Sequence, residues 1–370
     1  MRLAAAAALL SVLALCGQAA AAEPALTLSW VGDMSFSRGQ GLPRKPDSVF
    51  ASVRGSLAAD VVTGNLEGTL GRGGPSKCGG GNGGSCFAFQ APASYAGVFA
   101  RAGFELLNMA NNHSHDFGAS GLRQTEAALK GAGIARTGLR GVVRVMKANG
   151  VRVAFLGYAP YSWAGPLLDI PQARGEVKRA RSARRAVARL RASRRRGAAE
   201  LRAARAEVAA AAARADVVIV FVHAGAEGSG ATHVPHGMEH AFGEARGETR
   251  RFARTMIDAG ADAVLGSGPH VLRGIQCHRG KPIAYSLGNF VGYHTLSTAG
   301  VAGLSGVLRI RVDRTGAFLG GRLVPVVLKR PGVPRLDPRR RSIGLVRRLS
   351  RQDFGGSRCR MGADGKFAAP

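Results

Sequence analysis

The chain has 370 residues, of which 46% are hydrophobic and 20% charged, so it is long enough for one large α/β domain or two smaller ones with an ample core. Lys and Arg number 52 against 23 Asp and Glu, a formal net charge of +29, and such a surface attracts polyanions. Aromatic residues, at 6%, are few for stacking nucleic-acid bases, so nucleic acid is not an expected partner.

The first 22 residues have the pattern of a secretory signal peptide. Arg2 precedes an apolar run over residues 3–15, and the small residues 20–22 come before Glu23. A buried helix or a membrane anchor is the alternative, but the run is short for spanning a bilayer. We expect cleavage after Ala22, with no other segment able to cross a membrane. The mature chain is then secreted, or held in the extracytoplasmic envelope, away from nucleic acid.

Export leaves four cysteines, which allow three disulfide pairings. Cys78 and Cys86 flank a Gly-rich loop, so a local disulfide between them is expected. Cys277 and Cys359 would then tie the tail to the body. Four free thiols are the alternative, which an oxidising compartment disfavours.

Short apolar runs alternate with helical patterns along the chain, which is typical of an α/β fold. The Asn149-Gly150 pair predicts a hairpin between residues 142–146 and 151–158. Further strands are expected at 26–31, 61–63, 106–109, 217–222, 263–265, 283–286, 307–312 and 322–328, and helices at 49–59, 93–102, 118–130 and 248–259.

Residues 172–215 consist mostly of Ala, Arg, Glu, Leu and Val, which predicts one or two helices. From Arg174 to Arg205 only Glu176 and Glu200 oppose the positive charge. This segment is either a solvated helical face or a polyanion-binding arm. No break in composition requires a second domain, so one domain is expected over 26–330. The basic C-terminal tail, 331–370, is expected to be mobile.

Six short polar signatures follow one another along the chain, and four of them come directly after an apolar strand. Parallel strands bring their carboxyl ends to one edge of a sheet, where α/β proteins gather metal or phosphate sites. The signatures are GDM at 32–34, GNLE at 64–67, ANNHSHD at 110–116, HAGAE at 223–227, GSGPH at 266–270 and SLGNF at 286–290.

The side chains of these signatures suit a divalent metal such as Zn, Mn or Fe, which accept mixed nitrogen and oxygen ligands. Asp116 lies three residues after His113 and is placed to hold its ring. Blander alternatives stay open: Asp33 as a turn or capping residue, Asn111 and Asn112 as turn residues. His115 is expected on an exposed loop, and His233, His236 and His240 on the surface or in a lid. The candidate residues are Asp33, Glu67, Asn112, His113, Asp116, His223, Glu227 and His270.

In order and spacing, these signatures resemble those of the bacterial capsule synthesis protein CapA family, the poly-γ-glutamate biosynthesis group also called PgsA. The resemblance covers roughly residues 26–328. That family is in turn similar to calcineurin-like metallophosphoesterases, which implies a four-layer α/β/β/α sandwich with a dinuclear metal centre. By motif, it implies metal ligands at Asp33, Glu67, Asn112, His223 and His270. It also implies a proton donor at His113, held by Asp116, and an acid or supporting partner at Glu227.

Two departures from the metallophosphoesterase pattern bear on the metal. Ser35 stands where Asp-x-His would supply an imidazole, and Ser267-Gly268 precedes Pro269-His270 where a second histidine is usual. One metal, a weakly held pair or no metal all stay open.

The resemblance and the charge predict a secreted protein of capsule or envelope polymer biosynthesis that handles poly-γ-glutamate or a similar polyanion. Other capsule-synthesis proteins are its expected partners. A metal-dependent phosphoesterase or other hydrolase of the envelope is the first alternative, and a non-catalytic polyanion-binding protein is the second. Whether the chain is an enzyme stays open.

Overall fold

The computed structural model describes residues 26–79, 86–161 and 183–370, without the side chains of 183–194. The expected signal peptide, and residues 172–182 of the Arg- and Ala-rich segment, lie outside this part of the chain. The expected helix at 49–59 is a 3-10 turn, Pro46–Val49, followed by the short helix α1, Arg54–Leu57. None of the described helices combines the length and apolar character needed to cross a lipid bilayer.

The larger of two main sheets has ten strands in the order β19-β20-β17-β16-β1-β2-β5-β6, with β15 added beside β1 and β18 beside β17. Strands β1, β2, β5, β6 and β15 run parallel, so their carboxyl ends share one edge. The bounds are β1 Leu26–Phe36, β2 Val61–Leu66, β5 Leu106–Asn108, β6 Ala135–Thr137, β15 Asn289–Tyr293, β16 Leu304–Val312 and β17 Phe318–Lys329.

The second sheet has six strands in the order β13-β14-β12-β9-β8-β7. The predicted hairpin is confirmed: Asn149 (φ 49°) and Gly150 (φ 81°) form a left-handed two-residue turn between β7 and β8. The bounds are β7 Arg144–Ala148, β8 Val151–Tyr158, β9 Val217–His223, β12 Ala263–Ser267, β13 Ile275–His278 and β14 Lys281–Ala284.

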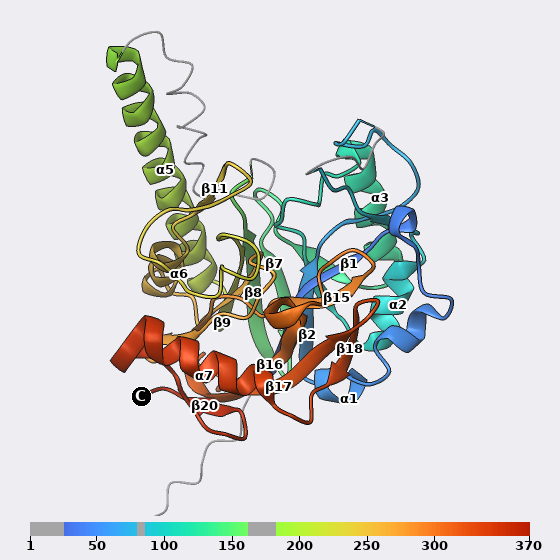
Figure 1. Ribbon diagram of the computed structural model, residues 1–370. Coiled ribbons are helices and arrows are strands. Elements are labelled where there is room, and N and C mark those ends of the chain that lie inside the picture. Colours follow the sequence, from blue (N-terminus) through green and yellow to red (C-terminus); the bar gives the residue numbers. More distant parts are fainter. Residues whose placement is uncertain (1–25, 80–85, 162–182) are drawn as a thin grey trace, which may run out of the picture.

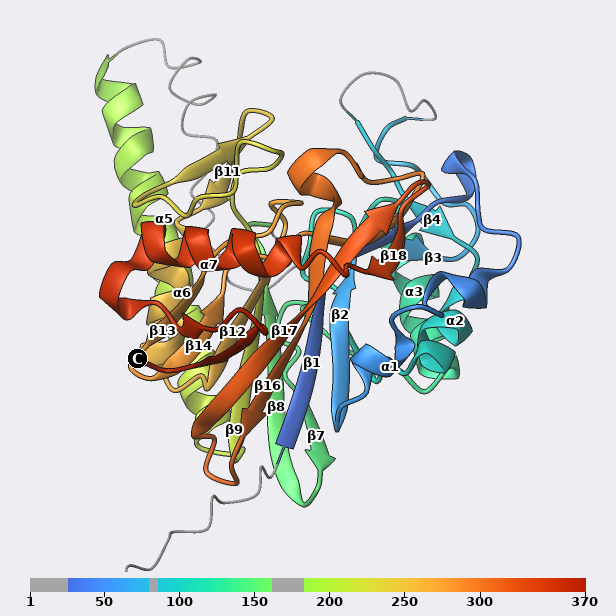
Figure 2. The ribbon, with the colours of Figure 1, turned by 60° about the horizontal axis from the view of Figure 1, so that its bottom comes forward.

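The two sheets pack face to face and helices cover both outer faces, which confirms the predicted four-layer α/β/β/α sandwich (Figures 1 and 2). Between the sheets, Trp30 of β1 stacks on Phe221 of β9 at 4.5 Å between ring centroids. Helices α2, Tyr95–Ala102, and α3, Gly118–Gly131, pack on the ten-stranded sheet. Helices α5, Ala183–Ala212, and α6, Thr249–Asp258, pack on the six-stranded sheet.

The prediction of a mobile tail after Pro331 is wrong. Residues 333–368 form strand β18, Val333–Leu336, helix α7, Arg341–Phe354, and strands β19, Arg360–Met361, and β20, Lys366–Ala368. Figure 2 shows α7 running across the sandwich, and its buried Ile343, Val346 and Leu349 belong to the core between the sheets. Apolar side chains on one face hold this helix in place despite its many arginines.

Candidate functional site

The site lies where the carboxyl ends of the parallel strands of both sheets meet. The structure brings all eight candidate residues together there. In β1, Asp33 pairs with Asn65 of β2 on one side and with Asn289 of β15 on the other, while His223 of β9 pairs with Ser267 of β12. A Cβ atom at Gly32 would lie 1.9 Å from the carbonyl oxygen of Gly288, so only glycine lets β1 approach this closely.

Asp33 is fully buried and joins the two sheets. Its Oδ1 accepts a hydrogen bond from Asn65 Nδ2 (2.8 Å), and its Oδ2 accepts one from the backbone N–H of Gly268 (3.2 Å). His270 Nδ1 lies 3.2 Å from Oδ2, and His223 Nδ1 lies 3.5 Å from Oδ1. Burial alone raises the pKa of Asp33, but the hydrogen bonds and charges of the two histidines outweigh it and lower that pKa well below its usual range.

Glu67 occupies the centre of the cluster. Three imidazole Nε2 atoms face its Oε1, those of His270 at 3.6 Å, His223 at 3.8 Å and His113 at 4.0 Å. Among the described residues no hydrogen-bond donor reaches either oxygen of Glu67, although the side chain is fully buried. An unpaired buried carboxylate is costly, so this position calls for a positive charge.

The pKa shifts of the cluster in the absence of a cation agree with a requirement for positive charge beside Glu67. Burial, followed by the charge of Asp33, raises the pKa of Glu67 well above its usual range. Burial alone lowers the pKa of His270, but Glu67 and Asp33 outweigh it and raise that pKa to about 10. Without a cation, protons shared among these groups supply the positive charge.

Each of the three imidazoles is anchored through Nδ1, which leaves Nε2 toward Glu67. Nδ1 of His270 lies 2.9 Å from Asn289 Oδ1, and that of His223 lies 3.0 Å from Ser267 Oγ. Nδ1 of His113 lies 2.8 Å from Asp116 Oδ2, in the arrangement expected from their spacing. Histidines that bind metals are typically held in this way by an acceptor on the other ring nitrogen.

A buried network of side-chain amides supports the cluster, and the sequence analysis missed most of it. Asn65 Oδ1 accepts hydrogen bonds from Asn108 Nδ2 (3.0 Å) and Asn111 Nδ2 (3.1 Å). Asn112 Oδ1 lies 3.0 Å from His223 Nε2, so Asn112 belongs to the site and is not merely a turn residue. Asn65 and Asn289 stand inside the GNLE and SLGNF signatures, where the amide within the signature could have marked them.

Lys77 and Arg246 are basic side chains of the site that the sequence analysis did not identify. Lys77 Nζ lies 2.6 Å from Asp116 Oδ1 and 3.4 Å from His113 Nδ1. The Arg246 guanidinium, almost fully buried, forms an ion pair with Glu227. Glu227 Oε2 in turn lies 3.7 Å from His270 Nε2, so Glu227 is on the edge of the cluster.

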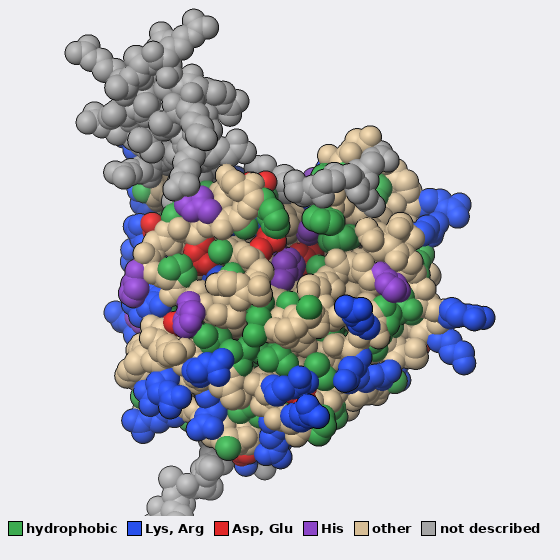
Figure 3. Space-filling model, viewed as in Figure 1, with side chains coloured by type: hydrophobic (Ala, Val, Ile, Leu, Met, Phe, Trp, Pro, Cys, Tyr) green, Lys and Arg blue, Asp and Glu red, His purple; other side chains and the backbone are tan. Residues whose placement is uncertain are grey.

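A cavity of about 950 Å³ opens over the cluster. Figure 3 shows acidic and histidine side chains gathered in a hollow of this face, with Lys and Arg around it. The cavity is lined by residues that include Lys77, Phe89, His113, Glu227, Arg246 and His270.

The histidines expected on the surface or in a lid lie elsewhere. None of His233, His236 or His240 lines the cavity, so the lid alternative is not supported. His233 pairs with Asp353 of α7, and His236 contacts Arg250 of α6. His115 is half-buried and not exposed as expected.

The donor set fits a divalent cation. Ligand atoms of Asp33, Glu67 and His270 lie within 4.8 Å of one another, and the Nε2 atoms of His223 and His113 face the same carboxylate. Mixed carboxylate, imidazole and amide donors suit Zn, Mn or Fe. Ser267 stands where a further imidazole was missing from the motif, and its hydroxyl contacts the Nδ1 atom of His223.

Several known proteins similar to this chain are named for capsule or polymer synthesis. It is 27% identical to "PGA biosynthesis protein CapA" of Bacillus subtilis, over 73% of this chain and 64% of that one. It is 32% identical to "Capsule biosynthesis protein CapA" of Bacillus anthracis, over 51% and 40%. A "Probable polyglutamine synthesis accessory protein" of Mycobacterium tuberculosis is 34% identical over 50% and 44%. The chain thus matches less than two thirds of the length of these relatives.

Among solved structures, a 5'-nucleotidase precursor from Thermus thermophilus superposes with a TM-score of 0.43 at 13% identity, over 85% of this chain and 57% of that one. A TM-score this low carries no argument about fold or activity. The family described as "Bacterial capsule synthesis protein PGA_cap" matches residues 27–294, which include all eight candidate residues. This chain therefore belongs to the PGA_cap family of bacterial capsule synthesis proteins.

Proposed function

We propose that this chain is an extracytoplasmic protein of capsule or envelope polymer biosynthesis, whose carboxylate–imidazole cluster binds a divalent cation and acts on an anionic polymer. Poly-γ-glutamate is the polymer that the printed names of the relatives suggest. The net charge of +29 supports a polyanionic partner. The two disulfides, Cys78–Cys86 and Cys277–Cys359, support a location outside the reducing cytosol.

The observation that carries the proposal is the environment of Glu67. Its buried carboxylate meets three imidazole nitrogens at 3.6–4.0 Å and no hydrogen-bond donor from the described residues. Asp33, Glu67, Asn112, His223 and His270 would hold the cation. A bound divalent cation supplies Lewis acidity and charge stabilisation at this point.

The remaining residues position and move protons. Asp116 accepts the Nδ1–H of His113, so Nε2 is the atom of this ring that can accept a proton from, or return it to, a group in the cavity. Glu227 is fixed by Arg246 and faces His270. His113, held by Asp116, and the nearby carboxylate of Glu227 favour hydrolysis or group transfer on the polymer over binding alone.

Metal content tests the first step. Purified residues 23–370 should contain Zn, Mn or Fe in a fixed ratio to protein, and the Asp33→Ala, His223→Ala double variant should not, because it removes two of the donors. The matched control is Asp258→Ala, His278→Ala, a surface Asp–His pair joined at 3.0 Å that does not line the cavity. Elemental mass spectrometry is the measurement. No metal in any of the chains, even after incubation with each ion, would rule out the cation site.

The same variants separate catalysis from binding. A metal-dependent enzyme should lose turnover of poly-γ-glutamate in the double variant, while a non-catalytic polyanion-binding protein should keep its affinity for the polymer. Polymer length and free glutamate report turnover, and retention on immobilised polymer reports affinity.

A further inference from the structure

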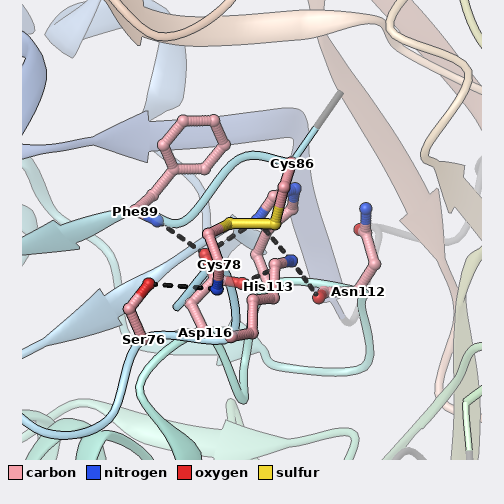
Figure 4. The surroundings of a disulfide bond; sticks show 8 residues. Ser76, Cys78, Cys86, Phe89, Asn112, His113 and Asp116 are labelled. Carbon is pink, nitrogen blue, oxygen red and sulfur yellow. Dashed lines mark hydrogen bonds and ion pairs between the residues drawn. A yellow bond between two sulfur atoms is a disulfide. The ribbon is translucent and has the colours of Figure 1, made fainter. Parts of the chain in front are cut away.

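A disulfide-closed excursion reaches the site from outside the sandwich. Residues 71–79 follow strand β3, Thr69–Leu70, residues 86–89 precede strand β4, Gln90–Ala91, and the bond between Cys78 and Cys86 joins these two arms of the excursion. Figure 4 shows this disulfide directly beside His113, Asp116 and Asn112. Cys86 itself lines the cavity. The cross-link therefore lies next to the proton-exchanging part of the site.

Both arms of the excursion hold the Asp116 carboxylate, which is fully buried. Lys77, immediately before Cys78, places Nζ 2.6 Å from Oδ1. On the other arm, the backbone N–H of Phe89 donates to Oδ2 at 2.6 Å, and Oδ2 also accepts from His113 Nδ1 at 2.8 Å. The orientation of the His113 ring thus depends on a carboxylate that the two arms hold between them.

The two arms differ in how they are attached. Phe89 is fixed without the disulfide, because its carbonyl accepts the backbone N–H of Thr69 (2.9 Å) and its ring packs on His113 at 4.6 Å between centroids. Lys77 contacts the loop that carries Asn112 and Asp116. Its Nζ donates to the carbonyl of Asn112 (3.1 Å), and its backbone N–H donates to the carbonyl of Asp116 (2.8 Å). Its side chain is one-third exposed. Holding a lysine in one rotamer costs conformational entropy, and a cross-link at the next residue reduces the backbone freedom that must be lost.

We propose that Lys77 is a positioning residue for His113, acting through Asp116, and that the Cys78–Cys86 disulfide keeps it in place. The proposal rests on the role proposed above for His113. Lys77 pairs with Oδ1 of Asp116 and its Nζ lies 3.4 Å from His113 Nδ1, while Oδ2 of the same carboxylate holds the ring with Nε2 toward Glu67. Without the cross-link the sandwich still folds, but the ring is held by Asp116 and Phe89 alone.

The test is the ring ¹⁵N spectrum of His113, recorded on metal-free residues 23–370 and assigned with His113→Gln. In the unaltered chain the two ring nitrogens should show the well-separated signals of one fixed tautomer. Lys77→Met and the Cys78→Ser, Cys86→Ser double variant should both move these signals toward their average. Lys77→Arg, which keeps a cation, should leave them in place. The control is Cys277→Ser, Cys359→Ser, which removes the other disulfide and should also leave them unchanged.

Turnover of poly-γ-glutamate gives a second reading, with an expected loss of roughly 10- to 100-fold for Lys77→Met, the usual effect of removing a supporting partner. Unchanged His113 signals in both the Lys77→Met and Cys78→Ser, Cys86→Ser chains would overturn the proposal. So would an equal change in the control pair, because it would indicate general loosening. An unaltered chain with neither metal nor turnover would contradict the proposed function but would leave the comparison of spectra intact.

Discussion

At the scale of single residues, the site is a concentration of buried charge. Asp33, Glu67 and Asp116 are all fully buried within reach of one group of imidazoles. In the metal-free chain each carboxylate loses its hydration, a cost that the two histidines outweigh at Asp33 but not at Glu67. The retention of this cluster at the floor of a cavity is a sign of function, since binding sites are where proteins tolerate unfavourable charge.

His113 gives a prediction about pH. Burial lowers the pKa of its ring below the usual 6.5, against the opposing effect of Asp116, so the folded chain binds this proton less readily than the unfolded chain. The stability that results is present above pH 6.5 and is lost as the pH falls below it. His113→Gln should therefore lose less stability than the unaltered chain between about pH 7.5 and about pH 5. Urea unfolding in the presence of a chelator measures this, and an equal loss in both chains would contradict it.

At the scale of secondary-structure elements, the C-terminal segment is an integral part of the sandwich. Helix α7 contributes to the core between the sheets, and the Cys277–Cys359 disulfide joins the segment that follows it to β13. Leu349→Ala should lower the free energy of unfolding by about 2–5 kcal/mol, as expected for a buried leucine. Arg348→Ala, at the exposed neighbour, should change it by no more than about 0.5 kcal/mol. Equal effects in urea unfolding would mean that the helix does not pack as described.

The sequence predicted the floor of the site well because that floor consists of strand ends. A polar residue after an apolar run predicted the position of the side chain at His223, the last residue of β9, and at Asp33, although β1 continues past Asp33 to Phe36. The partners contributed by distant loops were not predictable in this way. Lys77 meets Asp116 only because a disulfide-closed excursion folds back, and no local pattern records that contact. For α7, the prolines before it and its own arginines concealed apolar residues that recur every three or four positions on one face of the helix.

At the scale of the whole molecule, the positive charge is spread over several surfaces, and two helices allow a comparison. Figure 1 shows α5 extending beyond the six-stranded sheet, whereas α7 lies against the body. Among the described side chains, α5 exposes Arg195, Arg196, Arg202 and Arg205, while α7 exposes Arg341, Arg347, Arg348 and Arg351. A segment that projects can follow a flexible polymer more closely than one that lies flat. A polyanion-binding arm should therefore contribute more to polymer binding than α7 does, whereas a solvated helical face should not.

Replacing Arg195, Arg196 and Arg202 of α5 with glutamine should weaken binding to poly-γ-glutamate about tenfold at low salt. Replacing Arg347, Arg348 and Arg351 of α7 should weaken it less. Both variants remove three positive charges, so any effect of net charge alone is the same in each. Retention on immobilised polymer, measured from about 0.05 M to about 0.5 M NaCl, reports the difference and its screening. Equal losses would favour the solvated face.

The close contact of β1 with the turn at Gly288 also determines which residues around the cavity can be substituted without disturbing the site. The floor of the cavity is built where strands from both sheets are in contact, with no room for a Cβ atom at Gly32, so a change there disturbs several donors at once. The walls are different. Phe242 and Leu296 come from two separate connections, between β9 and α6 and between β15 and β16, each anchored at both ends in the sandwich. Loops held in this way can lengthen, shorten or change composition at little cost to folding. The architecture therefore joins a rigid donor cluster to wall loops that can change without disturbing it, an arrangement by which one scaffold can serve polymers of different chemistry.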